Sequence, residues 1–405
     1  MTSSILVSTK WSTTFSRIAG LRVGSGFLGM ASPSSGRGRA TAHILAAGIS
    51  RAPWAVVCDL SANPPFSPIE TEKNSATGTL LRMSMPYEGA PPPSRPEGTR
   101  AGRVVTGRRR GAGKRFLVVG DVLDGVLVHT TAHRIGVHDP AAEIRHRPTG
   151  AGGNTATWLG WLGAEVDVVA RVGVDDVYRH ERALEDAGVR AHLRYDAMTS
   201  TGVVVSVRND HGRTAMSDPA ASGKISAADV PPSVVARADI VHLTGAAMLG
   251  GGADRLADLV ACARTGPARV AVDPSSVAVI ETVGADRFLQ ALRGVDVLFP
   301  DQHEALALAG GDDLDTAVRR LTEHVPLVVV TAGADGALIG RRGRSVHRVP
   351  ATPATVVDTI GAGDAFVAGF VRAWATDPVR VGAAAREGTR VAARALGFVG
   401  GRPPV

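Results

Sequence analysis

Short apolar runs alternate with amphipathic stretches from residue 116 onward, and this alternation limits the fold more than any other feature of the sequence. The apolar runs that are short enough to be buried strands are 116–119, 166–170, 240–243, 270–272, 295–299 and 327–331. Stretches with helical periodicity lie between or after them, at 154–162, 177–187, 254–264, 303–309 and 314–323. The pattern predicts βαβ units, and therefore an α/β fold with a mostly parallel central sheet and helices on both of its faces.

Two segments depart from this pattern, at about 125–148 and 201–217. Both show strand-like alternation with turns, and neither is followed by a crossover helix. We expect them to pair as a small sheet outside the main one. Because ligands of parallel α/β sheets bind beyond the carboxyl ends of the strands, such a sheet would serve as a lid that excludes water from a reaction there. Two surface hairpins without a function are the alternative.

Residues 1–113 differ from the rest in composition. Residues 1–115 hold 16 Lys and Arg against 5 Asp and Glu, whereas the remainder of the chain holds 29 against 33. The stretch is rich in Ser, Arg, Pro and Gly and lacks sustained periodicity, so it buries too little apolar surface to offset the entropy of ordering. We predict a disordered, basic N-terminal extension, followed by one domain at 114–405. A transit peptide, or a translation start at Met83 or Met85, would also explain this composition.

The charge distribution and the cysteines exclude several classes of protein. Because the basic excess is confined to the extension, the folded body lacks the electrostatic footprint of a nucleic-acid-binding protein. No stretch approaches the ~20 apolar residues that a membrane span requires. Cys58 and Cys262 lie far apart and show no metal-binding spacing, so we expect a reduced, cytoplasmic protein.

Residues 356–366, Val-Val-Asp-Thr-Ile-Gly-Ala-Gly-Asp-Ala-Phe, carry the strongest chemical signal. A glycine-rich turn leads directly into a helical pattern, so the N–H groups of Gly361, Ala362 and Gly363 and the positive end of the helix dipole would converge on one point. This arrangement suits a phosphate. Asp364 is poorly placed to bind a phosphate but well placed to accept a proton from a hydroxyl that attacks one. The alternative is a plain helix start with Asp364 as a first-turn acid.

Residues 116–405 resemble the ribokinase-like (PfkB) family of carbohydrate kinases. The segments that carry the resemblance, in the family's order, are 149–156 leading into 158–163, 210–214, 301–304, 331–336 and 358–364. They look like the family's N-terminal signature, lid turn, kinase loop, nucleotide-side loop and C-terminal signature. The resemblance implies a three-layer α/β/α sandwich with a mostly parallel central sheet and a small β lid. It also implies ATP-dependent phosphorylation of a sugar or nucleoside hydroxyl with Mg²⁺, with a monovalent cation such as K⁺ as a further candidate.

The resemblance assigns roles to individual residues. Asp364 would be the catalytic base, and the N–H groups of Gly361, Ala362 and Gly363 would form the anion hole. The candidate substrate-binding residues are Asp124, Gly150, Asn154 and Arg213, and the candidate nucleotide-binding residues are Asp301, Glu304, Thr331, Gly333, Gly336 and Thr359. Glu304 would hold the water shell of Mg²⁺, because this ion prefers few protein carboxylates. The exposed edges of the lid would also permit a homodimer.

Several of these residues have a plainer interpretation. Asn154 could be a helix N-cap, Glu304 a first-turn helix acid and Arg213 a solvated lid residue. For Thr331, Gly333 and Gly336 the alternative is an ordinary turn after a strand.

Three positions depart from the family pattern. Thr149 replaces the first glycine of the N-terminal signature, Asp301 replaces the usual Asn of the kinase loop, and Gly125 stands where the substrate-gripping Asp is expected. Asp124, one place earlier, would have to take over that role. These changes keep open a second function, a sugar- or nucleotide-binding sensor that has lost turnover. A dinucleotide-dependent oxidoreductase is disfavoured, because residues 120–125 lack the G-x-G-x-x-G pattern.

Overall fold

The computed structural model describes residues 113–130, 141–209, 212–245 and 251–404, together with five short strands between residues 27 and 84. These strands are β1 (Phe27–Met30), β2 (Thr41–Ala47), β3 (Ala55–Asp59), β4 (Glu70–Asn74) and β5 (Gly78–Ser84), in the sheet order β1-β2-β3-β5-β4. They belong to one compact unit, Met1–Gly107, and the rest of the chain forms a second, Arg108–Val405. Most of residues 1–113 lie outside the described residues, so the disorder of this stretch remains a prediction.

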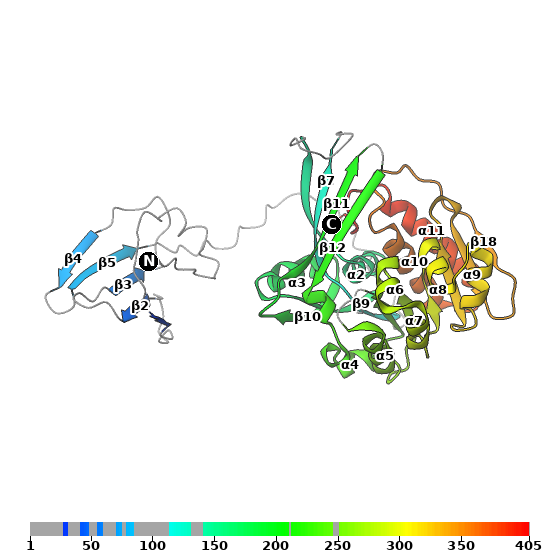
Figure 1. The fold of residues 1–405 in the computed structure, drawn as a ribbon, viewed down its shortest axis with the longest axis horizontal. Coiled ribbons are helices and arrows are strands. Elements are labelled where there is room, and N and C mark those ends of the chain that lie inside the picture. The colour runs from blue at the N-terminus through cyan, green and yellow to red at the C-terminus, as the bar shows by residue number, and fades with distance from the viewer. Residues whose placement is uncertain are drawn as a thin grey trace, which may run out of the picture. The chain divides into compact units, whose positions relative to one another are not determined.

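A nine-stranded sheet forms the centre of the second unit (Figure 1), in the order β10-β9-β6-β13-β14-β15-β16-β17-β18. Its strands are β6 (Arg115–Val119), β9 (Glu165–Gly173), β10 (Val189–Asp196), β13 (Ile240–Thr244), β14 (Arg269–Asp273), β15 (Val297–Leu298), β16 (Leu327–Thr331), β17 (Ala337–Arg341) and β18 (His347–Val349). All pairs from β10 to β16 are parallel, and β17 and β18 add antiparallel strands at one edge. The carboxyl ends of the parallel strands therefore lie on one side of the sheet.

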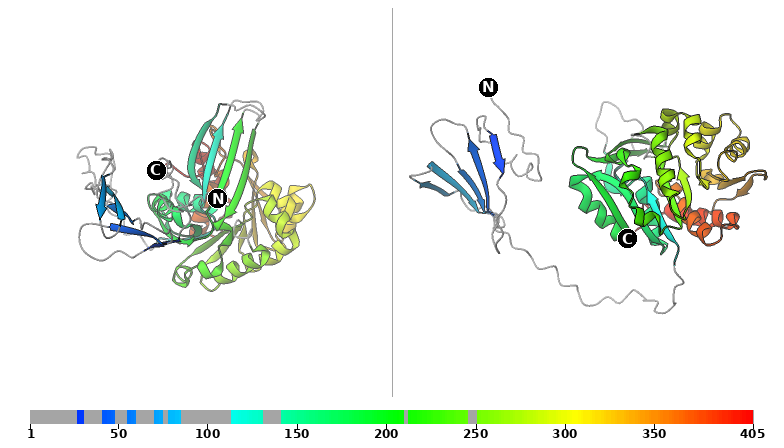
Figure 2. Two further views of the ribbon diagram at one scale, coloured as in Figure 1. Left: turned by 60° about the vertical axis from the view of Figure 1, so that its left-hand side comes forward. Right: turned by 90° about the horizontal axis from the view of Figure 1, so that it is seen from below.

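Helices cover both faces of this sheet (Figures 1 and 2). Because successive strand residues point to opposite faces, Phe116 and Val118 enter one buried cluster while Leu117 and Val119 enter another. The first cluster includes residues of α2 (Ala151–Trp161), α3 (Val177–Glu185), α10 (Ala362–Thr376) and α11 (Val381–Ala395). The second includes residues of α4 (Pro232–Val235), α5 (Gly252–Ala263), α6 (Val277–Val283), α7 (Ala285–Ala291), α8 (Gln302–Ala309) and α9 (Leu314–Leu321). The result is the predicted three-layer α/β/α sandwich.

A separate four-stranded sheet, the lid, projects from the body (Figures 1 and 2). Its strands are β7 (Leu123–His129), β8 (Glu143–Thr149), β11 (Thr201–Asn209) and β12 (Gly212–Ala220), in the order β12-β11-β7-β8. The pair β7–β11 is parallel, and the other two pairs are antiparallel. The two segments that break the βαβ pattern thus pair with each other as predicted.

The register of the lid gives it two distinct faces. Leu127 lies opposite Arg145 and Ser206, and the three side chains share one face. We call this the inner face, because Leu127 borders Gly400 and Arg208, two residues beyond Ser206, donates a hydrogen bond to a main-chain carbonyl of the body. On the two central strands, β7 and β11, the outer face carries mostly valines: Asp124, Val126, Val128, Val203, Val205 and Val207.

The structure differs from the predicted elements in several places, and it adds α4, α6, α7, α11, β17 and β18, which were not predicted. Helix α2 begins at Ala151, three residues before the predicted start. Strand β15 is shorter than the apolar run 295–299, and the edge strand β10 was not predicted because it is mostly polar. Among the residues that the structure describes, no helix is long and apolar enough to cross a bilayer.

Candidate active site

The glycine-rich turn before helix α10 has the backbone geometry expected of an anion site. Gly361 is the N-cap and has a left-handed φ of 74°, and a Cβ at this position would lie 2.4 Å from the Cα of Gly401. A Cβ on Gly363, by contrast, would meet nothing within 4 Å. No side chain caps the helix, and the N–H of Ala362 makes only a long hydrogen bond of 3.4 Å to the carbonyl of Thr359, so the start of the helix can still donate to an anion.

Asp364 lies in the first turn of α10 and is held by Asn154 of α2. The Nδ2 atom of Asn154 donates a hydrogen bond of 2.8 Å to Oδ2 of Asp364. Asn154 is buried, and its Oδ1 atom has no hydrogen-bond partner among the described residues. The structure therefore brings together two candidate residues that lie 210 positions apart, with one unpaired acceptor beside them.

Asp121, which the sequence analysis did not single out, fixes the start of α2. Its carboxylate accepts hydrogen bonds from the N–H groups of Ala151 (2.9 Å) and Gly152 (3.2 Å), and from the hydroxyl of Thr244 (2.9 Å). Gly150 precedes the helix with a φ of 97°, and a Cβ there would lie 2.6 Å from the carbonyl oxygen of Asp121. This external cap explains why the helix begins before Asn154. The sequence signal that could have identified Asp121 is its place just after the first core strand, β6.

Several carboxyl groups crowd the carboxyl ends of the strands. Burial raises the pKa of Asp364 to about 8, and the charges of Asp273 and Asp121 add to the rise, while the hydrogen bond from Asn154 opposes it. Burial also raises the pKa of Glu304 to about 7, with a further contribution from the charge of Asp301. The pKa of Asp273 is raised well above its ordinary value, again chiefly by burial.

These carboxyl groups fit a hydrated divalent cation. No ion pair with a basic side chain neutralises Asp273, Glu304 or Asp364 in the described part of the chain. Within the same residues, no group of three or more acidic, His or Cys side chains is close enough to bind a metal by itself. Mg²⁺ keeps several water ligands and needs few protein oxygens, so the arrangement suits it better than a cage of direct ligands would.

Candidate nucleotide-side residues from two segments lie side by side. Asp301 and Glu304 form a reciprocal capping box at the start of α8, with two hydrogen bonds of 2.8 Å. An isolated parallel bridge joins Asp301 to Thr331 at the end of β16. The loop after Thr331 contains Gly333, whose Cβ position is open, and Gly336, whose φ of 87° and contact with Val349 exclude a side chain.

Thr359 lies exposed in the turn that leads to α10, and its carbonyl accepts a hydrogen bond from the N–H of Ala362 (3.4 Å). Arg213 lies on the lid, on the inner face, and no contact between it and Asp364 is seen. The turn before Arg213 includes residues 210 and 211, which fall outside the described residues.

Asp124 is engaged elsewhere. Arg179 of α3 donates two hydrogen bonds to its carboxylate, of 2.6 and 2.7 Å, and the Nε2 atom of His180 lies 3.3 Å away. Burial alone would raise the pKa of Asp124, but these partners outweigh it and hold the pKa below its ordinary value. Gly125, the position at which the family's Asp is expected, lies on the inner face, so a shift of one residue turns the Asp124 side chain to the opposite face.

The C-terminal segment also enters the site, which the sequence analysis missed. The indole N–H of Trp158 donates to the carbonyl of Gly401 (3.0 Å), and the N–H of Gly400 donates to Oδ2 of Asp358 (2.9 Å). Arg402 donates to the carbonyl of Thr149 (3.2 Å), while its Nε and Nη1 atoms have no partner among the described residues. Burial lowers the pKa of Arg402 to about 10.

A cavity of about 350 Å³ lies between the inner face of the lid and the turn before α10. It is lined by Leu127, Val128, His129, Glu143, Arg145, Ser206, Arg208, Arg213, Val356, Val357, Asp358, Ile360 and Val399. Its volume falls in the range of about 300–1,000 Å³ that is typical of small-ligand sites. It therefore adjoins the anion-binding turn from the side of the lid.

Replacing each of the two glycines of the turn by alanine should change the stability of the fold differently, because one position is strained and crowded and the other is open. We expect Gly361→Ala to destabilise the fold by roughly 1–3 kcal/mol, because the new side chain meets the backbone of Gly401 and strains a left-handed residue. Gly363→Ala, inside the helix with open space around it, should leave stability equal or raise it by up to about 1 kcal/mol. Urea unfolding of both variants measures the difference, and equal stabilities would contradict the described turn.

The raised carboxyl pKa values predict that the folded protein becomes less stable as the pH rises. Asp364 and Glu304 keep their protons in the folded protein at pH values where the unfolded chain has lost them, so the free energy of unfolding should decrease as pH rises from 6.5 to 8. The buried His242, with a pKa lowered to about 4, acts in the opposite direction but only below about pH 6.5. Urea unfolding across this range should show a smaller decrease for Asp364→Asn. An unchanged decrease in that variant would show that Asp364 is not the source.

Comparisons with known proteins agree with this geometry. Residues 114–404 match the pfkB family of carbohydrate kinases. The chain is 31% identical over 247 residues to a fructokinase of Klebsiella pneumoniae, a match that covers 58% of this chain and 78% of the relative. It is 32% identical over 268 residues to a 1-phosphofructokinase of Rhodobacter capsulatus, which covers 63% of this chain and 81% of that protein.

The fold is similar to the crystal structure of adenosine kinase from Sinorhizobium meliloti, with a TM-score of 0.65 and 22% identity, over 73% of this chain and 97% of that one. The family resemblance predicted from the sequence motifs is thereby confirmed. This chain belongs to the pfkB family of carbohydrate kinases, and it is a phosphotransferase that acts on an alcohol group.

Proposed function

We propose that this protein transfers the γ-phosphate of ATP to a hydroxyl of a sugar or nucleoside, with Asp364 as the base. The observation that carries the proposal is the position of Asp364 directly after the N–H groups of Gly361, Ala362 and Gly363, which no side chain caps. A group transferred between them would have hydrogen-bond donors for its developing charge and an acceptor for the proton of the attacking hydroxyl.

Asn154 sets the orientation of the base. Because its Nδ2 atom binds Oδ2 of Asp364, the Oδ1 atom of Asp364 is left to take the proton from the substrate hydroxyl. The pKa of Asp364, about 8, is close to the pH at which the carboxyl group must accept this proton. Such a match favours efficient general base catalysis. The unpaired Oδ1 of Asn154 would accept a hydrogen bond from a second hydroxyl of the same substrate.

Kinases of this family use ATP, and the nucleotide would lie beside Asp301, Glu304, Thr331, Gly333, Gly336 and Thr359. Glu304 and its acidic neighbours would hold hydrated Mg²⁺, which neutralises phosphate charge when bound. A monovalent cation such as K⁺ is a further candidate beside the turn at Asp358, where the carboxylate already accepts two backbone hydrogen bonds.

The second candidate function is a binding protein that has lost turnover. Asp124 is engaged by Arg179 and His180, and Gly125 offers no carboxylate on the inner face, so one expected substrate contact is missing. A kinase whose substrate differs from the family's common sugars would also explain the missing contact. Measurement of ADP release distinguishes the two.

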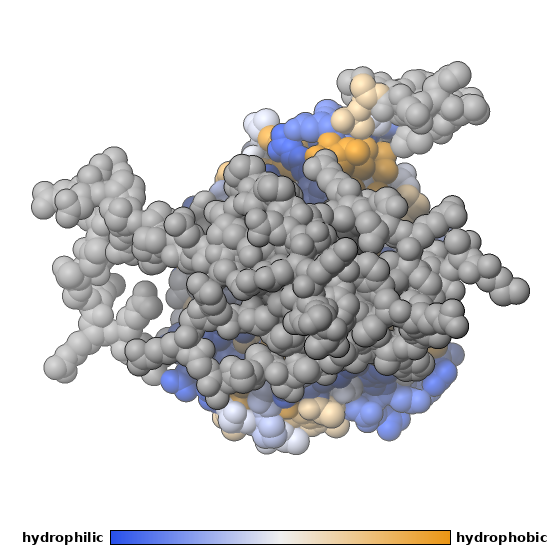
Figure 3. All heavy atoms as spheres, turned by 90° about the vertical axis from the view of Figure 1, so that its left-hand side faces the viewer, coloured by the Kyte–Doolittle hydropathy of each residue, from blue (hydrophilic) through white to orange (hydrophobic). Residues whose placement is uncertain are grey.

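We extend the proposal to location and assembly. An unpaired Cys262 and the absence of a metal-binding cysteine pattern favour the reducing cytoplasm. The outer face of the lid, rich in valine, and its two edge strands β8 and β12 would suit a homodimer through the lid. Figure 3 shows apolar and hydrophilic residues side by side at the height of the lid.

Replacing the base tests the proposal. Asp364→Asn keeps the shape and the neighbour of the side chain but cannot accept a proton, so turnover should fall by about 10² or more while ATP affinity changes little. A coupled assay of ADP release over pentoses, hexoses, their phosphates and nucleosides measures this. The matched control is Asp286→Asn, which also replaces a first-turn helix aspartate, but in α7. Near-normal turnover in folded Asp364→Asn protein would remove the base from the mechanism.

A further inference from the structure

The four arginines of the lid strands all lie on its inner face. They are Arg145 and Arg147 of β8, Arg208 of β11 and Arg213 of β12. Chance placement in alternating strands would divide them between the two faces. The outer face instead carries valines, so the basic side chains gather on the side that faces the body.

The register places like charges directly opposite each other. Arg208 lies directly opposite Arg213. Directly opposed like charges destabilise a sheet, and nothing in this pairing compensates for the repulsion. An anion held between these side chains would convert the repulsion into attraction.

The acids nearby leave Arg208 and Arg213 without a carboxylate partner. Glu143 lies opposite His129, but its carboxylate pairs with Arg145. The carboxylate of Asp358 accepts hydrogen bonds from two backbone N–H groups, those of Ile360 and Gly400. Within the described part of the chain, the side chain of Arg208 donates only to the carbonyl of Val357, and no side-chain hydrogen bond or ion pair is seen for Arg213.

The same arginines border the cavity described above. Arg145, Arg208 and Arg213 line it, together with Ser206, which offers a hydroxyl on the same face. The opposite wall is the stretch from Val356 to Ile360, which leads directly into Gly361 and Asp364. Arg208 reaches across to the carbonyl of Val357, so a ligand in this cavity would have arginines of the lid beside it and the phosphate-transfer site beyond Ile360.

We infer that the substrate carries a phosphate of its own, bound by Arg208 and Arg213 of the lid, and that the hydroxyl to be phosphorylated lies at the other end of a sugar phosphate. The inference rests on the proposed kinase function and names the substrate class. Guanidinium groups bind a phosphate through paired, charge-assisted hydrogen bonds, and a dianionic phosphate would satisfy both arginines. Inorganic phosphate shares this chemistry, so the experiment must separate the two.

Binding of matched pairs of sugars to the full chain tests the inference. Calorimetry with fructose 1-phosphate, fructose 6-phosphate and ribose 5-phosphate, each against its unphosphorylated parent, should show at least one phosphate that binds tenfold or more tightly than its parent. This preference should weaken with added salt, because the contact is ionic. Inorganic phosphate should compete only weakly, because it lacks the sugar contacts.

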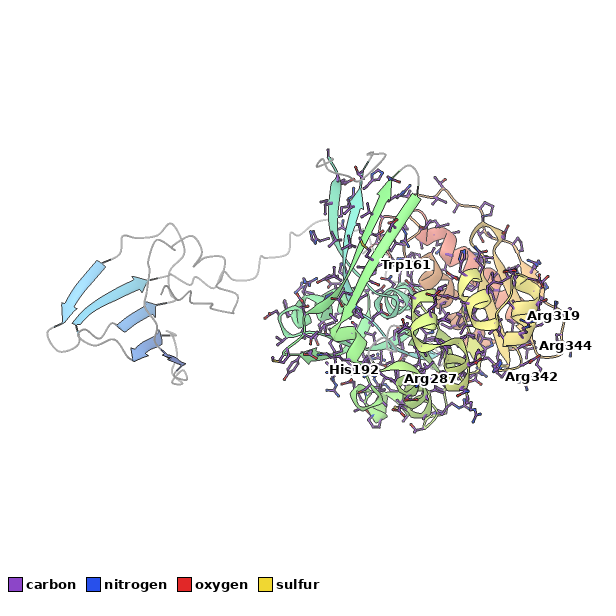
Figure 4. The ribbon with its side chains drawn as sticks, viewed as in Figure 1. Trp161, His192, Arg287, Arg319, Arg342 and Arg344 are labelled. Atoms are coloured by element: carbon purple, nitrogen blue, oxygen red, sulfur yellow. The ribbon has the colours of Figure 1, made fainter. Side chains whose placement is uncertain are left out.

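Replacing both lid arginines should remove the preference. In the variant Arg208→Gln with Arg213→Gln, the ratio of affinities between phosphorylated and parent sugar should fall by about tenfold or more, to near one. The matched control is Arg344→Gln, an exposed arginine in the turn between β17 and β18, far from the lid in Figure 4. This control should leave the ratio unchanged.

Each contrary result has a separate meaning. If no sugar phosphate binds more tightly than its parent, or if the double variant keeps the preference, the inference is wrong even when ATP-dependent phosphorylation is observed. If the variant weakens only MgATP binding, the arginines serve the nucleotide and the inference is again wrong. Arginine-dependent binding of a sugar phosphate without any ADP release would support the inference and refute the kinase function.

Discussion

The hydrogen bond between Asn154 and Asp364 is the contact on which the site depends. It joins helix α2, near the start of the domain, to helix α10, near its end, across 2.8 Å. The start of its own helix places each partner. Helix α2 starts where the carboxylate of Asp121 caps it, and α10 starts at Gly361, a left-handed glycine that lies against Gly401. If either helix began elsewhere, the hydrogen bond that orients the carboxyl group would be lost.

The second constraint is the crowding of negative charge around this bond. Residues that follow parallel strands lie together at the carboxyl ends of the strands. Several of the residues at this position are acids. Burial and the neighbouring carboxylates raise the pKa values of Asp364 and Glu304, so the folded protein keeps protons on these groups up to a higher pH. A site of this kind gains most from a bound cation, because the cation relieves the repulsion.

Much of the fold could be predicted from the sequence because its signals are local. Apolar runs of strand length and the alternation of segments determine the layers, and the two irregular segments predicted the lid. Residues whose role depends on distant partners could not be found in this way. Arg402 and Gly401 reach the site only because the chain returns to it after α11, and Asp121 acts through a helix that begins 30 residues later.

In the candidate site, too, the residues of a local motif could be predicted, and those that depend on distant partners could not. The turn at Gly361 and the base candidate Asp364 follow from a single short motif. The position of Asp124 does not, because sequence spacing cannot show which face of a strand meets the body, and a shift of one residue reverses it. The clustering of lid arginines likewise depends on register across four strands.

Transfer of labelled phosphate tests the central claim most directly. The purified chain is incubated with Mg²⁺, ATP labelled in the γ-phosphate and a mixture of sugars, sugar phosphates and nucleosides, and the products are separated. The account predicts that label appears in a phosphate ester of one acceptor class, and only when that acceptor is present. Label that stays in ATP, or that is released only as inorganic phosphate with every acceptor, would contradict it.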